Sequence, residues 1–420
     1  MSNALCHRVG HDGGVTIPNP QSGSLLRDEL IELGRSHGLA AMGVCDAEPF
    51  VETRLVLEQR RDQGLNADMA FTYRNPARST DPSRSLPGVK SMLVGAFRYE
   101  TAVPDPPSAP AARVARYATA DSYEQLRFAL QKVADKLIAA GYRAIVLADD
   151  NALVDRAAAV RAGIGWYGKS SNVLLPGEGS WFLLGSVLTD AELPSLGIPL
   201  EDGCGACSRC IDGCPTQAII APGVLDARRC LAWLLQAQGE FPREFREALG
   251  DRIYGCDECQ EVCPPSRRAD TAGNIESPPP ESVPAMEPAQ ATASEPQPGP
   301  GSWIDLHWLL SASDEELLSQ VGRWYIPARE PRYLRRNALV VLGNAQQPIN
   351  SGLQLLLADY LDHTDDLLVG HATWAALRLG LVELLDESTR AARPAILLER
   401  ANCDAEKQRI AISVRPELGD

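Results

Sequence analysis

The chain has 420 residues, 45% of them hydrophobic, and its 55 acidic and 40 basic side chains give a net charge of −15 at pH 7. This length predicts two or three domains, and the apolar fraction is that of a globular protein. The excess of acidic residues argues against broad, nonspecific binding of nucleic acid, and no apolar run is long enough to span a bilayer.

The first 199 residues predict a disordered extension followed by an α/β domain. Residues 1–23 lack hydrophobic periodicity, which is typical of disorder. In residues 24–199, helices are expected at about 25–37, 50–63, 122–140 and 153–162, with a cap at Ser24 and a capping box at Ser122 and Gln125. Strands are expected at 38–45, 92–97, 145–148 and 181–188. This alternation indicates an α/β domain.

Two carboxylates, Asp149 and Asp150, follow the strand expected at 145–148. Strand ends of open α/β sheets gather catalytic groups, so one of the two could be a general acid with a raised pKa. The alternative, given equal weight, is an N-cap for the next helix. Histidine is absent between His37 and His307, so a proton donor in this region would be a carboxylate, Tyr, Lys or Cys.

A glycine-rich loop, Gly163-Ile-Gly165-Trp-Tyr-Gly168-Lys169, follows the helix expected at 153–162. The order Gly-x-Gly-x-x-Gly is typical of dinucleotide sites only after a strand, so NAD binding is not predicted. The glycines instead favour close approach of the backbone to a large ligand. Lys169 either meets an anionic or amide-rich ligand or faces water.

Eight of the eleven cysteines lie between 204 and 263, in two runs that each end in Cys-Pro, with one cysteine between the runs. The first run has the bacterial ferredoxin spacing C-x2-C-x2-C-x3-C-P, and the cysteine before the proline then ligates the other cluster. Two [4Fe–4S] clusters are predicted, the first held by Cys204, Cys207, Cys210 and Cys263, and the second by Cys214, Cys230, Cys256 and Cys259. The alternative is structural zinc, which leaves the third cysteine of each turn unused.

The cluster segment is expected at 200–268, followed by a proline-rich linker at 269–301 and a helical region at 302–420. Helices are predicted at about 334–342, 353–361 and 372–385, as a short α-solenoid or a plain bundle. Five arginines lie among aromatic residues here, and they are Arg323, Arg329, Arg332, Arg335 and Arg336. Such a pattern suits RNA phosphates and unpaired bases, with a solvated helix face as the alternative.

Several short motifs together resemble one family. They are Arg116-Tyr-Ala118 with Asp121 and Tyr123, Asp149, Leu153-Val-Asp-Arg156, Ala162–Lys169, the cysteine framework, Arg335-Arg-Asn-Ala338 with Leu342-Gly-Asn344, and His371–Leu377. Over about residues 25–385 the chain resembles the epoxyqueuosine reductases, cobalamin-dependent iron–sulfur enzymes of queuosine tRNA modification. Where the family pattern continues Lys169 with Asn-Thr, this chain has Ser170-Ser171-Asn172.

The resemblance implies an α+β multidomain protein. It would comprise a nitroreductase-like cobalamin domain, a two-cluster ferredoxin-like domain and a HEAT-like helical repeat that binds tRNA. It implies reduction of epoxyqueuosine to queuosine at the tRNA wobble position, with Asp149 as the proton donor. Cobalamin contacts are expected from Arg116, Tyr117, Tyr123, Gly168, Lys169, Ser170 and Asn172.

A cytoplasmic monomer is expected, with a donor protein such as flavodoxin or ferredoxin. Two other functions remain open from the residues alone. A corrinoid iron–sulfur reductive dehalogenase would share both kinds of cofactor but has no need of an arginine-rich helical region. A non-catalytic electron-transfer or tRNA-binding protein would explain the cysteines and leave Asp149 without a role.

Overall fold

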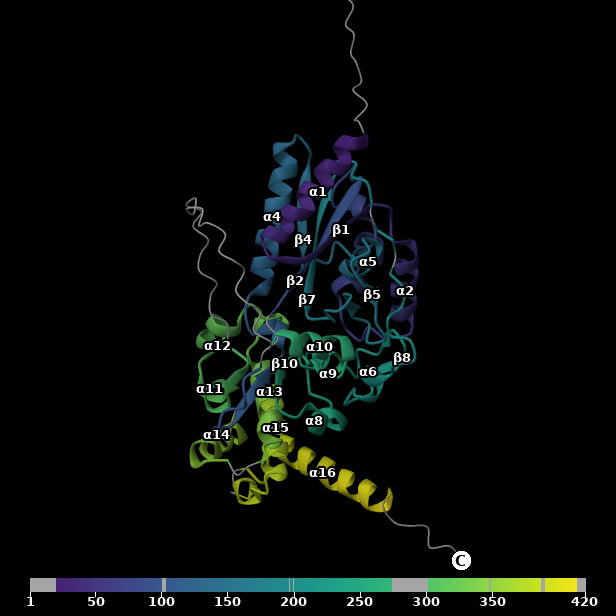
Figure 1. Ribbon diagram of the computed structural model, residues 1–420. Helices are drawn as coiled ribbons and strands as arrows, with labels where there is room; N and C mark the ends of the chain where they lie inside the picture. Colours follow the sequence, from purple (N-terminus) through teal and green to yellow (C-terminus); the bar gives the residue numbers. More distant parts are fainter. Residues whose placement is uncertain are drawn as a thin grey trace, which may run out of the picture.

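The computed structural model describes residues 20–99, 103–195, 197–198, 200–273, 301–346, 349–386 and 390–413. The extension expected before residue 20 and the proline-rich stretch 274–300 therefore lie outside the described residues. In Figure 1 a sheet with its helices occupies the upper part, and the segment that carries the cysteine runs and the C-terminal helices lie beside each other beneath it.

The main sheet has four antiparallel strands in the order β1-β2-β7-β4. They are β1 (Leu39–Asp46), β2 (Ser91–Arg98), β7 (Phe182–Thr189) and β4 (Ala144–Ala148). The alternation of helices and strands had suggested an open α/β sheet with catalytic groups at the ends of its strands. All three strand pairings are antiparallel, so the rule for parallel sheets does not apply here.

Helices cover both faces of this sheet. On one face α1 (Pro20–Ser36) and α4 (Ser122–Ala139) pack on side chains such as Leu93 and Val187. On the other face α2 (Val51–Asp62) and α5 (Asp155–Arg161) pack on Met92 and Leu188. Neighbouring residues of one strand point to opposite faces, so both must be apolar when both faces are covered.

A pair of glycines lets α4 approach the sheet closely. Gly95 of β2 lies opposite Gly185 of β7. A methyl group at Gly185 would lie 2.7 Å from Leu130, and one at Gly95 would lie 3.1 Å from the same side chain. Leu130, which is fully buried, therefore occupies the space that two side chains would otherwise fill.

A second sheet joins the three regions of the chain in the order β10-β3-β11. Its strands are β3 (Ala111–Val114), from the first region, β10 (Arg252–Tyr254), from the cysteine segment, and β11 (Trp303–Asp305), from the C-terminal region. One hydrophobic core continues from Ala112 through Leu231 and Ile253 to Leu339 and Leu361. The cysteine segment and the C-terminal helices therefore share a single core.

Short elements form the cysteine segment, and longer helices follow it. The segment contains α6 (Arg209–Asp212), β8 (Ile219–Ala221), β9 (Val224–Leu225), α7 (Leu231–Leu234), α8 (Arg243–Leu249), α9 (Glu258–Glu261) and α10 (Pro264–Gly273). The C-terminal helices are α11 (Leu306–Ser311), α12 (Asp314–Val321), α13 (Arg332–Gly343), α14 (Ser351–Leu361), α15 (Asp366–Arg378) and α16 (Pro394–Ser413). Smaller elements are α3 (Pro76–Ser79), the hairpin strands β5 (Trp166–Tyr167) and β6 (Val173–Leu174), and the 3-10 turns η1 (Phe71–Tyr73), η2 (Pro82–Arg84), η3 (Arg116–Ala118), η4 (Pro327–Arg329) and η5 (Val382–Leu385).

Several expected boundaries were wrong. Helix α1 already includes Ser24, so this serine is not its cap. Asp121, not Ser122, caps α4, because its carboxylate accepts the N–H of Glu124 at 3.1 Å. Helix α15 begins six residues before the expected position, because Asp365 caps it by accepting the N–H of Leu367. The expected linker overlaps the end of α10, which continues to Gly273.

Within the part of the chain that the structure describes, none of the helices has both the length and the apolar character needed to cross a membrane.

The turn that leads into β7 attaches the main sheet to the cysteine segment. The N–H of Ser180 donates to the hydroxyl of Ser266 at 3.2 Å, and the hydroxyl of Ser180 donates to the side-chain oxygen of Gln260 at 3.0 Å. Gly179 precedes it with a φ of +75°, and a methyl group there would lie 2.5 Å from the Cα of Ser266. The two regions can meet this closely only because residue 179 has no side chain.

We expect Gly179→Ala to destabilise the protein more than Gly177→Ala does. Both glycines have left-handed backbones, with φ of +75° and +76°, but a methyl group at Gly177 would meet nothing within 4 Å. Subtracting the effect of the second variant removes the common backbone strain and leaves the clash, worth about 1–3 kcal/mol. Chemical unfolding of both variants measures the difference, and equal losses would contradict the packing argument.

Candidate active site

The two cysteine runs meet in one cavity of about 240 Å³. The lining includes Cys204, Cys207 and Cys210 from the first run and Cys263 from the second. Burial raises the pKa of Cys210, and the nearby thiols of Cys263 and Cys204 raise it further. These are the four residues that the ferredoxin spacing groups around the first cluster.

The other four cysteines form a second group. Burial raises the pKa of Cys256 to about 12, and Cys230 and Cys214 add to this rise while Arg252 opposes it. Burial also raises the pKa of Cys259 well above its ordinary value, with Cys256 as the next cause. Cys210 has a smaller effect on Cys259, so the two groups adjoin each other.

The donor set suits clusters that take up thiolate charge. A buried thiol is costly to ionise unless a cation accepts its charge, and iron does so. In the described ranges, no three His, Cys, Asp or Glu side chains converge closely enough to hold a single metal ion. In a [4Fe–4S] cube each thiolate binds a different iron, so its ligands stand farther apart than the ligands of one zinc ion.

The glycine-rich loop contacts the first cysteine turn. Trp166, Gly168, Lys169 and Ser170 line the same cavity as the four cysteines. The Lys169 ammonium donates to the carbonyl of Gly205 at 2.6 Å and to that of Cys207 at 2.9 Å. This loop was expected to contact cobalamin, and in the structure its lysine holds the turn between Cys204 and Cys207.

Asn172 reaches the second group. Its side-chain amide donates to the sulfur of Cys259 at 3.7 Å. The hydroxyl oxygen of the adjacent Ser171 is buried and has no hydrogen-bond partner among the described residues. A segment that was expected to bind only cobalamin therefore also touches a predicted cluster ligand.

Asp149 lies in a tight turn after β4, with a φ of +56° that non-glycine residues seldom adopt. The turn is fixed by Ser79, whose hydroxyl donates to the carbonyl of Asn151 at 2.6 Å, and by Arg78, which donates to the Asn151 side chain at 3.3 Å. Burial raises the pKa of Asp149, and the Arg127 guanidinium opposes that rise. The turn thus holds a carboxyl group that keeps its proton to a higher pH than usual.

Neither aspartate caps helix α5. The cap position is Val154, which makes no side-chain capping bond. Asp150 has a local role instead, because its carboxylate accepts the N–H of Ala152 at 2.8 Å. The N-cap alternative for Asp149 and Asp150 is therefore wrong.

Asp149 has two ionisable neighbours: Asp155, which sequence reasoning did not single out, and Tyr123, which was expected to contact cobalamin. The Oδ1 atom of Asp155 is buried and has no hydrogen-bond partner among the described residues. Burial raises the pKa of Asp155 well above its ordinary value, and Asp149 adds to the rise. Burial also raises the pKa of Tyr123, with Asp149 as the next cause. An acidic residue at the start of an alanine-rich helix was the only available signal.

Arg116 supports the cluster segment. Its guanidinium pairs with Asp270 at 3.2 Å and lies 4.3 Å from the ring centre of Trp181. Its backbone N–H donates to Asp257, between Cys256 and Cys259, at 2.8 Å. The contacts that the structure describes for Arg116 therefore run to α9, α10 and the start of β7.

Tyr254 connects Tyr117, an expected cobalamin contact, with the start of the arginine-rich segment that was expected to bind tRNA. The ring of Tyr254 stacks on Trp324 with centroids 4.4 Å apart and lies 6.3 Å from Tyr117. Trp324 and Arg323 both donate to the carbonyl of Ala118. Arg323 is thus engaged in joining the C-terminal region to the turn at 116–118.

The predicted tRNA-binding role of Arg336 is wrong. Its side chain is completely buried, and its donors are used by backbone carbonyls and by Asn337. The other arginines are partly engaged: Arg335 pairs with Asp314, Arg332 pairs with Asp365 at 2.8 Å, and Arg329 donates to the carbonyl of Gly322. The segment is therefore not one continuous basic surface.

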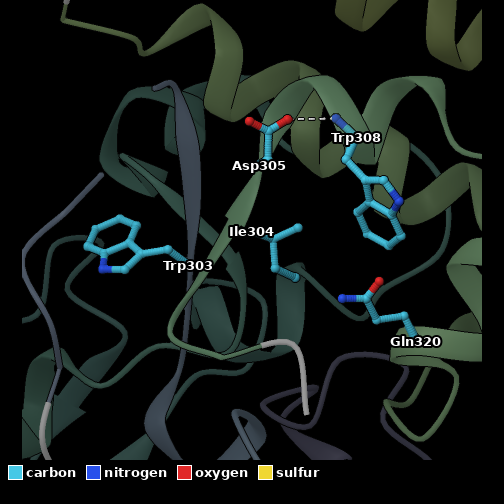
Figure 2. A pocket seen from close by; sticks show the side chains of 5 residues that line it. All are labelled: Trp303, Ile304, Asp305, Trp308 and Gln320. Atoms are coloured by element: carbon cyan, nitrogen blue, oxygen red, sulfur yellow. Dashed lines mark hydrogen bonds between the residues drawn. The ribbon is translucent and has the colours of Figure 1, made fainter. Parts of the chain in front are cut away.

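A separate hollow of about 230 Å³ lies where β11, α11 and α12 meet. Figure 2 shows its lining, which is Trp303, Ile304, Asp305, Trp308 and Gln320. The Asp305 carboxylate accepts the N–H of Trp308 at 2.8 Å and caps α11. Since no predicted site residue lines this hollow, we assign it no part in the chemistry.

Comparisons with known proteins agree with this arrangement. Residues 203–266 match the family model of the 4Fe-4S double cluster binding domain. An epoxyqueuosine reductase of Bacillus cereus is 33% identical over 364 residues, covering 84% of this chain and 89% of that protein. One of Vibrio cholerae is 37% identical over 262 residues, covering 59% and 68%. A crystal structure of epoxyqueuosine reductase with a tRNA-Tyr epoxyqueuosine-modified tRNA stem loop aligns with a TM-score of 0.76 and 28% identity, covering 91% of this chain and 98% of that one.

We expect Lys169→Met to loosen the turn between Cys204 and Cys207. The methionine keeps most of the volume but leaves the carbonyls of Gly205 and Cys207 without their shared cation. Amide hydrogen exchange of a peptide spanning 203–210 should become faster. Lys136→Met, at an exposed ion pair with Glu29, is the control and should leave this peptide unchanged. Unaltered exchange in Lys169→Met would show that the lysine does not hold the turn.

Proposed function

Because the chain belongs to the epoxyqueuosine reductase family, we propose that it reduces epoxyqueuosine to queuosine at the wobble position of tRNA. The observation that carries this proposal is the cavity in which Cys263 of the second run joins Cys204, Cys207 and Cys210 of the first. In two-cluster ferredoxins the cysteine before the proline of one run ligates the cluster of the other run, and this arrangement is typical of an electron relay. The proposed ligand sets are the two groups of four cysteines described above.

Cobalamin fits the residues beside the clusters. The buried Ser171 hydroxyl lacks a partner in the described part of the chain, and the amide-rich edge of cobalamin could supply one. We propose Tyr117, Tyr123, Gly168, Ser170 and Asn172 as its contacts, with Arg116 and Lys169 supporting the adjoining cysteine turns. When bound, the clusters would supply single electrons and cobalamin the reducing centre that acts on the epoxide.

Asp149 is the proposed proton donor. Removal of the epoxide oxygen as water consumes two electrons and two protons and leaves the alkene of queuosine. The departing oxygen therefore needs an acid that is still protonated near neutral pH. Burial raises the pKa of Asp149, which favours the protonated form, and the turn fixed by Ser79 holds it in place.

For tRNA we propose Arg329 and Arg332 as phosphate contacts, because both lie at least partly at the surface. Arg335 is more enclosed, and Arg323, although exposed, donates to the carbonyl of Ala118, so both would act by holding the segment in place. An RNA phosphate could compete with Asp365 for Arg332, since an exposed ion pair is worth little. This replaces the expected row of five arginines with a smaller contact.

We further propose a nitroreductase-like domain at 24–199, a ferredoxin-like segment at 200–268 and HEAT-like helices from 302 onward. Helices on both faces of the main sheet, and the packing of α15 against α13 and α14, support these assignments. A cytoplasmic monomer reduced by flavodoxin or ferredoxin completes the proposal. Every cysteine that the structure describes is free, as a reducing compartment would require.

Asp149→Asn should abolish most turnover while leaving both clusters and tRNA binding intact. The amide is similar in size but cannot donate the proton, and loss of a general acid typically costs about 10²- to 10⁴-fold in rate. Mass analysis of the modified tRNA after anaerobic reaction measures turnover, with iron content and tRNA affinity measured alongside. Asp150→Asn is the matched control and should keep near-normal activity. Normal turnover in Asp149→Asn would remove this residue from the mechanism.

Arg127→Gln should shift the alkaline limb of the pH–rate profile to higher pH. Arg127 favours the ionised form of Asp149, so its loss raises the pKa of Asp149 further and keeps the acid protonated over a wider range. Lys132→Gln, which removes a cation from the same helix beside Phe128, is the control. A limb that stays in place, or moves to lower pH, would refute the link between Arg127 and the acid.

A further inference from the structure

Arg336 lies at the centre of a buried set of hydrogen bonds between α13 and the cysteine segment. Its Nη1 atom donates to the carbonyls of Ala237 at 2.8 Å and Gly239 at 2.7 Å. Its Nη2 atom donates to the carbonyl of Leu234 at 3.1 Å. The same Nη2 atom donates to the carbonyl of Leu235 at 3.4 Å, so four backbone oxygens share this guanidinium. Loss of the donor would be costly for those that are buried, because an unpaired buried carbonyl costs about 1–3 kcal/mol.

Asn337 extends these contacts to a second segment. Its side-chain oxygen accepts from Arg336 at 2.8 Å, and its amide donates to the carbonyls of Leu235 at 2.9 Å and Ile253 at 3.4 Å. Asn337 is also completely buried. The two neighbouring side chains therefore bind both the end of α7 and strand β10.

Both of these segments carry cysteines of the second group. Cys230 is the N-cap of α7, and its carbonyl accepts the N–H of Leu234 at 2.9 Å. Cys256 follows the end of β10 by two residues. The contacts of Arg336 and Asn337 thus set the spacing between the segments that deliver Cys230 and Cys256.

The first group is held differently. Its cysteine turn is bound by Lys169, which precedes the cysteine segment in the chain, whereas α13 follows it. None of the hydrogen bonds described for Arg336 and Asn337 reaches Cys204, Cys207, Cys210 or Cys263. The two groups can therefore be perturbed separately.

We propose that Arg336 and Asn337 are positioning residues for the second iron–sulfur cluster, acting through the backbone on either side of Cys230 and Cys256. This rests on the ligand sets of the proposed function. The C-terminal helical region then contributes to the electron relay, because two adjacent residues of α13 position the backbone that carries ligands of the second cluster. Burial lowers the pKa of Arg336 to about 10, so the guanidinium remains charged at neutral pH and can hold the carbonyls.

The test compares five variants of the full chain after anaerobic reconstitution with iron and sulfide. Arg336→Met and Asn337→Asp remove the proposed contacts, and Arg335→Met removes the neighbouring ion pair with Asp314 as the control. Lys169→Met is the reciprocal variant for the first cluster. Cys256→Ser removes a proposed ligand and so identifies the spectrum of the second cluster. Iron content, EPR of the reduced protein and redox titration are measured for each.

We expect the iron content of Arg336→Met to fall from about eight irons per chain towards about four, with loss of the second-cluster spectrum only. Asn337→Asp keeps the acceptor for Arg336 and loses both amide donors, so it should shift the second-cluster potential and leave the first unchanged. Lys169→Met should affect the first cluster and leave the second unchanged. Arg335→Met should match the wild type in iron content, EPR spectrum and both cluster potentials. If Arg336→Met does not fold, Asn337→Asp decides the question.

Two unchanged potentials in Asn337→Asp, or equal shifts in both, would overturn the inference. A wild-type chain that binds zinc or only four irons would instead refute the ligand sets of the proposed function. The two failures are therefore distinguishable.

Discussion

The structure depends on Cys263 reaching out of its own run to the cysteines of the other. Cys256 and Cys259 belong to one group and Cys263 to the other. The short helix α9, which contains Cys259 and ends two residues before Cys263, therefore links the two groups. Each group also draws on residues more than 30 positions apart in the chain. Such sites form only if the intervening backbone is held firmly, because a misplaced thiol would leave an iron without a ligand.

Two cationic side chains that bind backbone carbonyls provide that support. Lys169 binds the turn that carries Cys207, and Arg336 binds the loop that follows Cys230. Each of these positive side chains binds more than one carbonyl oxygen. A hydrogen bond from a charged donor is stronger than one between neutral groups. The sheet β10-β3-β11 adds a third connection, so the sheet domain and the C-terminal helices both help to build the cluster region.

The proposed acid depends on a different balance. Asp149 lies at the surface, but the protein around it removes part of the water from its carboxyl group, which raises its pKa and favours the protonated form, while Arg127 favours the ionised form. Asp155 and Tyr123 lie close enough to influence or feel its charge. A carboxyl group held between these influences keeps its proton to a higher pH than an ordinary aspartate, which suits a proposed proton donor.

The sequence by itself determined the chemistry of the cysteines, because ligand spacing within a turn is a local property that Cys-x-x-Cys and Cys-Pro encode directly. It also located most helices and strands of the first 199 residues and placed Asp149 directly after a strand. Only the tertiary structure decided that the main sheet is antiparallel, that Lys169 serves the cysteine turn, and that Arg336 is buried. A run of arginines looks the same in sequence whether it faces RNA or a set of inward-pointing carbonyls. The difference lies in which segments pack against it, and contacts between α13 and residues about 100 positions away leave no local pattern.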